Sequence, residues 1–358
     1  MLAHQRFMNA VLGVLPHIDE NPLILPRLSS LTLSGLLIDP NAIKDSCGFI
    51  LQLVTYADDV SVFSLFEALC GPNEELKEVQ QWLIDVGFIQ VLIKELESMY
   101  SPALKNCGRT DHNGSLLVAY YNIIKIASSS KILRKEVKLS SVLAVLNRDL
   151  GELPSYIEDA RWEAMASLAC AKTFDVMRTL FQESVEMITD PKRVRTRASV
   201  SALHILAFMI KFDPIIPEFV LYAKLPKVTT DLMKANPDHS ILHAAATYFL
   251  MSCLENPVTM TNTMNEIASF VLYSMNQSNR NIAATGMNLL SKVSDAEKVN
   301  EDIFNAMNEV PGFVKEVKDP FAVYVRLLDD DYGGPMPIFS VDNANKLALL
   351  TMKMMRAW

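Results

Sequence analysis

The pair His239 and His243 is the part of this sequence whose residue types and spacing come closest to a chemical site. Four residues apart on a helix, two imidazoles share one face and could both reach a metal ion. Zinc needs three or four ligands, yet the chain has 6 histidines and no HExxH motif to supply a general base. The pair therefore gives only weak support to a metal-dependent helical enzyme, and we expect no metal ligand, no cofactor and no catalytic residue.

The helix that must carry this pair has a recognisable start. Asn236 and Pro237 precede it, and Asp238 or Ser240 could cap its free backbone N–H groups. His239 is then predicted in the exposed first turn. His243 is predicted beside the apolar stripe of the helix, so the two histidines have separate roles.

Other catalytic patterns do not occur. The sequence has no GxxxxGK[ST], no GxGxxG and no GxSxG motif. The acidic runs at Asp58–Asp59 and 329–331 lie in predicted loops, where we interpret them as solvated charge.

Helical periodicity recurs along the chain. The run at 79–96 changes its apolar register at Gly87, which predicts two short helices rather than one. Segments 113–127 and 195–211 each predict a helix with one broad apolar stripe, and His204 lies beside the second stripe. Prolines fall between such runs, and the 12 glycines are few for 358 residues.

These patterns predict an all-α protein. We expect an α-solenoid of divergent HEAT- or armadillo-like repeats over 1–328, because helix pairs of about 40 residues bury their faces by stacking on their neighbours. A compact bundle is the alternative. An acidic, Gly- and Pro-containing linker is expected at 329–340, and a C-terminal helix or tail at 341–358.

Composition limits the partners and the compartment. A net charge of −8 argues against nucleic acid as the main partner. The basic run 191–197 is either a solvated loop or a site for an acidic partner segment or a phosphate. Five scattered cysteines without a CxxC pair fit a reducing compartment. The first residues lack the order of a signal peptide, and the longest apolar stretch is too short for membrane insertion. We expect a cytoplasmic protein, or one shared between cytoplasm and nucleus.

A family resemblance begins in the run Val79-Gln-Gln-Trp-Leu-Ile-Asp-Val-Gly-Phe-Ile. It resembles the Val-x-x-Trp-Leu-x-x-x-Gly-Leu-Ile pattern of the SAPS-domain proteins, the regulatory subunits of protein phosphatase 6. Further pieces follow in the same order as in that family. They are Asn21-Pro-Leu at the start, Ser61 to Leu69, His112-Asn-Gly-Ser leading to Asn122-Ile-Ile, and the segment from Arg197 to Ile210.

The stretch 237–243, PDHSILH, resembles the Asn-Asn-x-Leu-His motif of the same family. Leu242 and His243 match its ending, whereas His239 has no counterpart and the first Asn is missing. The resemblance spans about 20–290. It implies a divergent member of the family, with a helical-repeat fold.

The resemblance implies a non-catalytic regulatory or scaffold subunit. Such a subunit would bind a serine/threonine phosphatase catalytic subunit of the type 6 class and direct it to substrates. A generic armadillo- or HEAT-type adaptor for a transport or cytoskeletal complex is the alternative. Candidate partner-binding residues are Trp82, Asn113, Arg193, Arg195 and His243. Trp82 could instead pack in the core.

Overall fold

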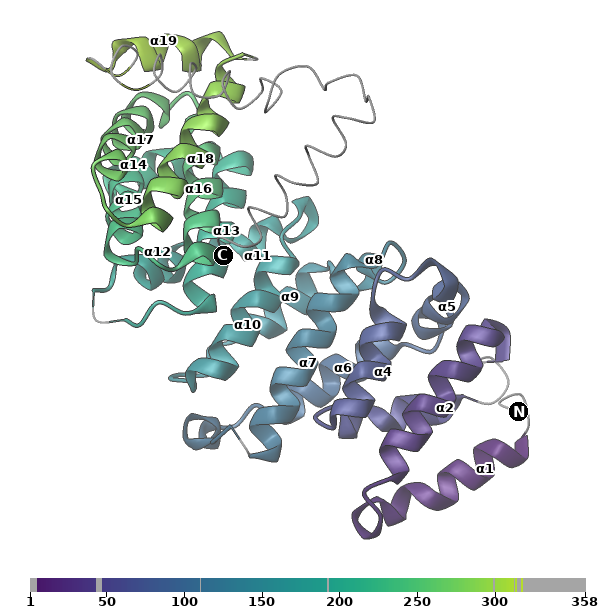
Figure 1. The fold of residues 1–358 in the computed structure, drawn as a ribbon. Helices are drawn as coiled ribbons and strands as arrows, with labels where there is room; N and C mark the ends of the chain where they lie inside the picture. Colours follow the sequence, from purple (N-terminus) through teal and green to yellow (C-terminus); the bar gives the residue numbers. More distant parts are fainter. Residues whose placement is uncertain are drawn as a thin grey trace, which may run out of the picture.

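The computed structural model describes residues 5–42, 47–109, 111–191, 193–298 and 300–311, together with Phe313 and Val317. Every regular element in these residues is a helix, so the prediction of an all-α chain is confirmed. The linker predicted at 329–340 and the C-terminal helix or tail predicted at 341–358 lie outside the described residues. Figure 1 shows the described helices following one another along the molecule, from α1 to α19.

One helix of each successive unit belongs to a row in which every member contacts the next. We call it the first row: α2 (Ile24–Ile38), α4 (Val60–Cys70), α7 (His112–Ser129), α10 (Ser155–Ser167), α13 (Arg197–Phe212), α16 (Ser240–Leu254) and α18 (Arg280–Glu297).

A second row packs against the first and is also continuous from neighbour to neighbour. It consists of α5 (Lys77–Asp85), α6 (Phe88–Ser98), α9 (Ser140–Leu146), α11 (Phe174–Thr179), α12 (Phe181–Thr189), α15 (Leu225–Ala235), α17 (Met260–Met275) and α19 (Glu301–Glu309). Helices that contact mainly their neighbours in sequence are typical of helical-repeat proteins, and the two rows are consistent with an α-solenoid.

The remaining elements lie outside the two rows. They are α1 (Gln5–Val14), α8 (Arg134–Val137) and α14 (Ile216–Tyr222), with 3-10 turns at Leu15–Glu20, Pro40–Ala42, Gly48–Tyr56, Glu74–Leu76, Pro102–Asn106 and Ala171–Thr173.

Local sequence explains where the helices begin and end. Gly87 has φ of 69°, a left-handed conformation that glycine adopts readily, and it separates α5 from α6 as predicted. Asp59 caps α4 by accepting hydrogen bonds from the backbone N–H groups of Ser61 at 2.8 Å and Val62 at 3.2 Å. The predicted helices at 113–127 and 195–211 are also confirmed, as α7 and α13.

The apolar stripes of both rows meet in one continuous core. The stripe predicted on α7 is buried throughout, including Leu117, Tyr120 and Ile124. Among the cysteines, Cys47, Cys70 and Cys253 are buried, and all five are unpaired. Within the described residues, no helix is both long and apolar enough to cross a membrane.

Candidate functional site: a groove along the first row

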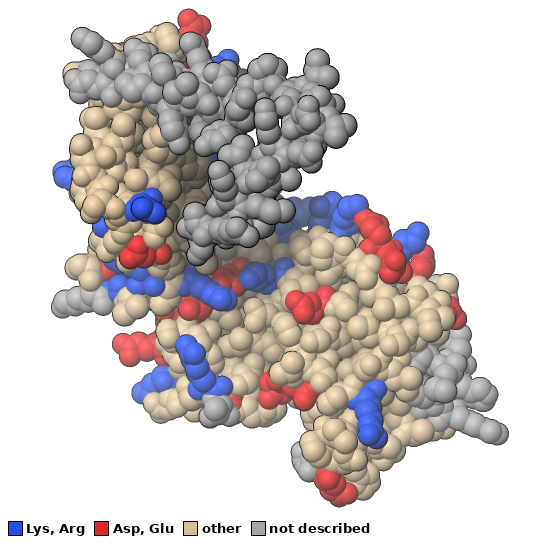
Figure 2. All heavy atoms as spheres, in the orientation of Figure 1, with Lys and Arg blue, Asp and Glu red and all other residues tan. Residues whose placement is uncertain are grey.

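Two neighbouring cavities lie along α7, α10, α13 and α16, and we call them together the groove. The first has a volume of about 470 Å³ and the second about 680 Å³. Glu163 of α10 and Arg197 of α13 line both cavities, so the two adjoin at these side chains. The middle of the molecule, where α10 and α13 lie in Figure 1, carries a gathering of Lys and Arg side chains with some acids among them in Figure 2.

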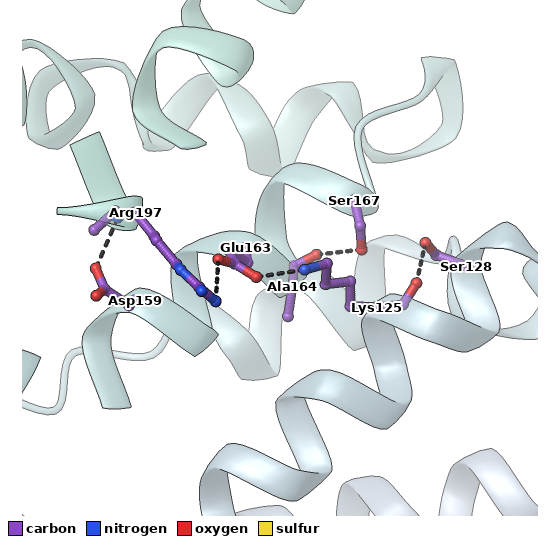
Figure 3. A network of polar contacts seen from close by, with 8 residues as sticks. Lys125, Ser128, Asp159, Glu163, Ala164, Ser167 and Arg197 are labelled. Atoms are coloured by element: carbon purple, nitrogen blue, oxygen red, sulfur yellow. Dashed lines mark hydrogen bonds and ion pairs between the residues drawn. The ribbon is translucent and has the colours of Figure 1, made fainter. Parts of the chain in front are cut away.

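A carboxylate with a cation on each side divides the two cavities (Figure 3). Glu163 pairs through Oε2 with the ammonium of Lys125 on α7, and through Oε1 with the guanidinium of Arg197 at 3.5 Å. The Glu163 side chain is 16% exposed, whereas those of Lys125 and Arg197 are 45% and 73% exposed. Both cations therefore remain accessible to a ligand from solution. Because each pairs with Glu163, both are held at the groove.

Helix capping places Arg197 at this position. Thr196 caps α13, and Asp159, one turn before Glu163 on α10, accepts a hydrogen bond from the backbone N–H of Ala198 at 2.8 Å. A carboxylate at a helix N-terminus is favourable for both the free N–H groups and the helix dipole. Asp159 thus fixes the start of α13 against α10, with Arg197 in the first turn.

Most of the residues that line the first cavity are polar. Arg109 lies over the ring of Tyr156, with its Cζ 6.0 Å from the ring centroid. The Tyr156 hydroxyl donates a hydrogen bond to the carbonyl of Gly108 at 2.8 Å, which holds the ring against this wall. Ser115 and Asn122 of α7 complete the polar lining.

The second cavity has a more apolar lining. Ile241 and Tyr248 of α16 are 61% and 44% exposed there, and Val200 and Phe208 of α13 are partly exposed. The ring of His204 lies 5.5 Å from that of Tyr248, centroid to centroid. Large apolar side chains left exposed inside a concavity are typical of a binding surface.

With this geometry described, the chain can be compared with known proteins. No family model, curated protein or solved structure matches it. The phosphatase-subunit resemblance therefore stays a prediction from the sequence, and the function has to be inferred from the residues themselves.

Two of the predicted partner-binding residues are buried. Trp82 is 9% exposed and belongs to the core, the alternative that the sequence left open for it. His243 is 3% exposed. Its Nε2 contacts the carbonyls of Asn236 at 2.9 Å and Met233 at 3.2 Å, and its Nδ1 contacts the Thr285 hydroxyl at 2.8 Å. Both ring nitrogens are thus used within the protein.

The two predicted arginines lie in the loop before α13 and make internal contacts. Arg193 pairs with Glu158 of α10. Arg195 donates hydrogen bonds to the carbonyls of Met187 at 2.8 Å and Asp190 at 2.7 Å, and so satisfies the end of α12. Asn113 is exposed in the first turn of α7, apart from the residues that line the groove.

The histidine pair does not form a shared site. His239 is the N-cap of α16, and its Nδ1 accepts a hydrogen bond from the backbone N–H of Leu242 at 3.2 Å. The cap is therefore His239 rather than the predicted Asp238 or Ser240. Asp238 instead accepts from the side-chain amides of Asn279 at 3.1 Å and Asn281 at 3.0 Å.

Metal ligands do not cluster in the part of the chain that the structure describes: no group of three or more His, Cys, Asp or Glu could hold an ion there. Asp58 contacts His112 Nδ1 at 2.6 Å, a neighbour that its sequence context did not reveal, while Asp59 serves as a helix cap. The acids at 329–331 lie outside the described residues.

The residues that shape the groove were not among the predicted site residues. Lys125, Glu163 and Arg197 come from three helices and are joined only by folding. Arg197 is the last residue of the basic run 191–197, which the sequence analysis named as a possible site for an acidic partner segment. This run therefore did indicate one residue of the groove. Lys125 and Glu163 are polar positions on helices whose other faces are apolar, a pattern too common to be selected from sequence.

Proposed function

We propose that this chain is a non-catalytic scaffold that binds another protein in the groove. The observation that carries the proposal is the lining itself. Four successive first-row helices leave accessible cations, hydrogen-bonding groups and large apolar side chains in two adjoining cavities. Repeat proteins use such extended surfaces to hold partner segments.

The partner that we propose first is a serine/threonine phosphatase catalytic subunit of the type 6 class, which the scaffold would direct to its substrates. Support for this partner comes from the collinear sequence pieces alone, from Asn21 to His243. The groove supports protein binding in general. A HEAT- or armadillo-type adaptor for another complex, in transport or at the cytoskeleton, has the same structural support.

Affinity purification of the full chain, followed by quantitative mass spectrometry, tests this proposal. We expect a phosphatase catalytic subunit to be enriched reproducibly over a tag-only control. Titration of that purified subunit into the purified chain should then give a saturable one-to-one signal by calorimetry.

The same experiment separates the alternatives. Reproducible enrichment of a different complex, with no phosphatase, would contradict the phosphatase partner and favour the adaptor. If neither purification nor direct titration with candidate subunits yields a binding partner, the scaffold function itself is wrong.

A further inference from the structure

We propose that the groove binds an extended segment of a partner protein in which an anionic side chain, a carboxylate or a phosphate, lies about three or four residues from a bulky apolar side chain. This inference rests on the proposed scaffold function and specifies the ligand class of its groove. It is carried by the accessible arginines of the first cavity, Arg109 and Arg197, by the apolar lining of the second cavity, and by the spacing between them.

Charge complementarity selects the anionic side chain. Three cations line the groove, Arg109, Lys125 and Arg197, against two acids. Both acids are already used: Glu163 by two cations, and Asp159 by the backbone of α13. The groove therefore carries one more cation than acid, in a chain with a net charge of −8.

The cations also keep unused hydrogen-bond donors. A guanidinium has five N–H donors and an ammonium has three. Among the described residues no carboxylate pairs with Arg109, and Arg197 has one long contact, at 3.5 Å, with Glu163. A carboxylate or phosphate between Arg109 and Arg197 would gain charge-assisted hydrogen bonds without breaking an internal one.

The second cavity selects an apolar side chain. Ile241, Tyr248 and Phe208 offer aliphatic and aromatic surface, and the Lys211 ammonium makes a cation–π contact with Tyr248, 5.4 Å from the ring centroid. Burying one ligand Leu or Phe side chain against these residues removes apolar surface from water on both partners. Aromatic residues in such positions are frequent binding hot spots.

Spacing follows from the helix row. The first cavity lies between α7 and α10, and the second extends from Lys125 on α7 to α16, so their centres are offset by about one helix across the row. The second cavity also lies further along α7 and α10, because the residues that line it follow those of the first cavity in sequence. Packed helices lie about 8–10 Å apart, and an extended chain advances about 3.3 Å per residue. A separation of about three or four residues therefore matches the two side chains to the two cavities.

A nucleic acid fits this surface less well. Its regularly repeated phosphates would meet Glu163 and Asp159 between the cations and would then cross an apolar cavity. A polypeptide can place one anion and one apolar group where each is needed. Nucleic acid binding in the experiment below would contradict the proposal.

Fluorescence anisotropy with synthetic peptides tests the inference. The probes are fluorescein-labelled 12-residue Gly-Ser peptides that carry one Phe and, four residues before or after it, a phosphoserine, Glu, Ser or Lys. A single-stranded oligonucleotide of similar length is the additional probe. We expect a phosphoserine or Glu peptide to bind the full chain at least about tenfold more tightly than the matched Lys peptide, a difference of about 1.4 kcal/mol. The phosphoserine and Glu arms show which source of anion is preferred.

Matched variants assign the binding to the groove. The double substitution Arg109→Glu and Arg197→Glu should abolish the preference for anionic peptides, and a first-turn Glu at 197 suits the start of α13. Lys135→Glu, exposed on α8 away from both cavities, is the control with a charge change of the same kind and should leave binding unchanged. Ile241→Ser with Tyr248→Ser should weaken Phe peptides and leave their Phe→Ser counterparts unaffected. Circular dichroism checks that each variant is folded.

Four results would overturn the inference: no binding of any peptide at the highest soluble concentration, binding of the Lys peptide equal to that of both anionic peptides, an anion preference that survives the double reversal, or binding of the oligonucleotide. Its failure is distinguishable from failure of the scaffold function. A partner that binds wild type and the double-reversal variant equally would refute this ligand class and retain the scaffold function. Absence of any partner would refute both.

Discussion

Glu163 and His243 occupy comparable places in two regions of the molecule, and their surroundings differ. Each lies on a first-row helix and joins it to the next: Glu163 links α10 to α13, and His243 links α16 to α18. Around Glu163, both cationic partners are accessible from solution. Around His243, the imidazole is buried and both ring nitrogens are used internally. A polar side chain whose hydrogen bonds are all internal supports the fold, whereas one whose partners keep spare donors at the surface can bind a ligand.

The largest effect is expected from His243→Ala. The substitution removes the imidazole donor from the carbonyls of Met233 and Asn236, each of which still accepts from a backbone N–H, and it creates a cavity in the core. We therefore expect the free energy of unfolding to fall by about 2–3 kcal/mol. Because repeat units interact mainly with their neighbours, hydrogen exchange should accelerate in α15–α18 and remain unchanged in α4 and α7.

His204→Ala is the matched control for this prediction. Its imidazole is exposed, and we expect a change of less than about 0.5 kcal/mol. Equal stability of the two variants in urea unfolding would contradict the structural role assigned to His243.

Gly286→Ala should have the next largest effect, again in the region around His243, which comprises α15–α18. A Cβ added to this α18 residue would lie 1.8 Å from Oγ and 2.7 Å from Cβ of Ser274 on α17, so the two helices must separate. Overpacking of this kind costs about 1–3 kcal/mol, more than the roughly 1 kcal/mol that alanine gains over glycine within a helix.

Gly114→Ala is the comparable change beside the groove. There the closest atom, at 2.1 Å, is the Tyr156 hydroxyl, the far end of a side chain that can swing outward. We expect a smaller loss of thermal stability than for Gly286→Ala. A larger loss would mean that the groove wall is as tightly packed as the α17–α18 contact.

The pH dependence of stability should originate in the region around the buried His243. Burial lowers the pKa of His243, although the nearby Asp238 carboxylate and the Met233 and Asn236 carbonyls raise it in part. In the unfolded chain the pKa is about 6.5. The unfolded state therefore takes up a proton before the folded state does, so stability is complete above pH 6.5 and decreases as the pH falls from there toward the folded-state pKa.

Urea unfolding at a series of pH values measures this slope. Desolvation also lowers the pKa of His204, so His204→Ala separates the two contributions. We expect that variant to keep the part of the wild-type slope between pH 7 and 5 that belongs to His243, a range set by the histidine reference value. If the slope disappears with His204 instead, the assignment to His243 is wrong.

The sequence was informative where a local signal determines the structure. Gly87 marked the break between α5 and α6, and the apolar stripes predicted which faces of α7 and α13 are buried. It was less informative for the choice among polar residues at a helix start, since Asp238, His239 and Ser240 all could cap α16. The groove could not be predicted, because Lys125, Glu163 and Arg197 meet only when helices more than thirty residues apart in sequence align in one row. That alignment depends on the lengths of the loops and of the second-row helices, and no sequence motif predicts how these lengths place the three side chains.

The smallest effect on stability, and the sharpest contrast with His243, is expected from Glu163→Gln. The substitution preserves the shape of the side chain and removes its charge. Its partners are exposed and screened by solvent, so we expect a change in unfolding free energy of less than about 1 kcal/mol.

In the Glu163→Gln variant, Lys125 and Arg197 lose the carboxylate that neutralises them. Anionic peptides should then bind up to about fivefold more tightly at low salt, because a unit charge at about 4 Å in water contributes about 1 kcal/mol. This gain should fade at high salt, where exposed charges are screened. Anisotropy at two salt concentrations measures it, with Lys135→Glu as the control outside the groove. Weaker peptide binding by Glu163→Gln would show instead that Glu163 positions the two cations. Glu163 and His243 would then both have a structural role, and their surroundings would differ only in exposure.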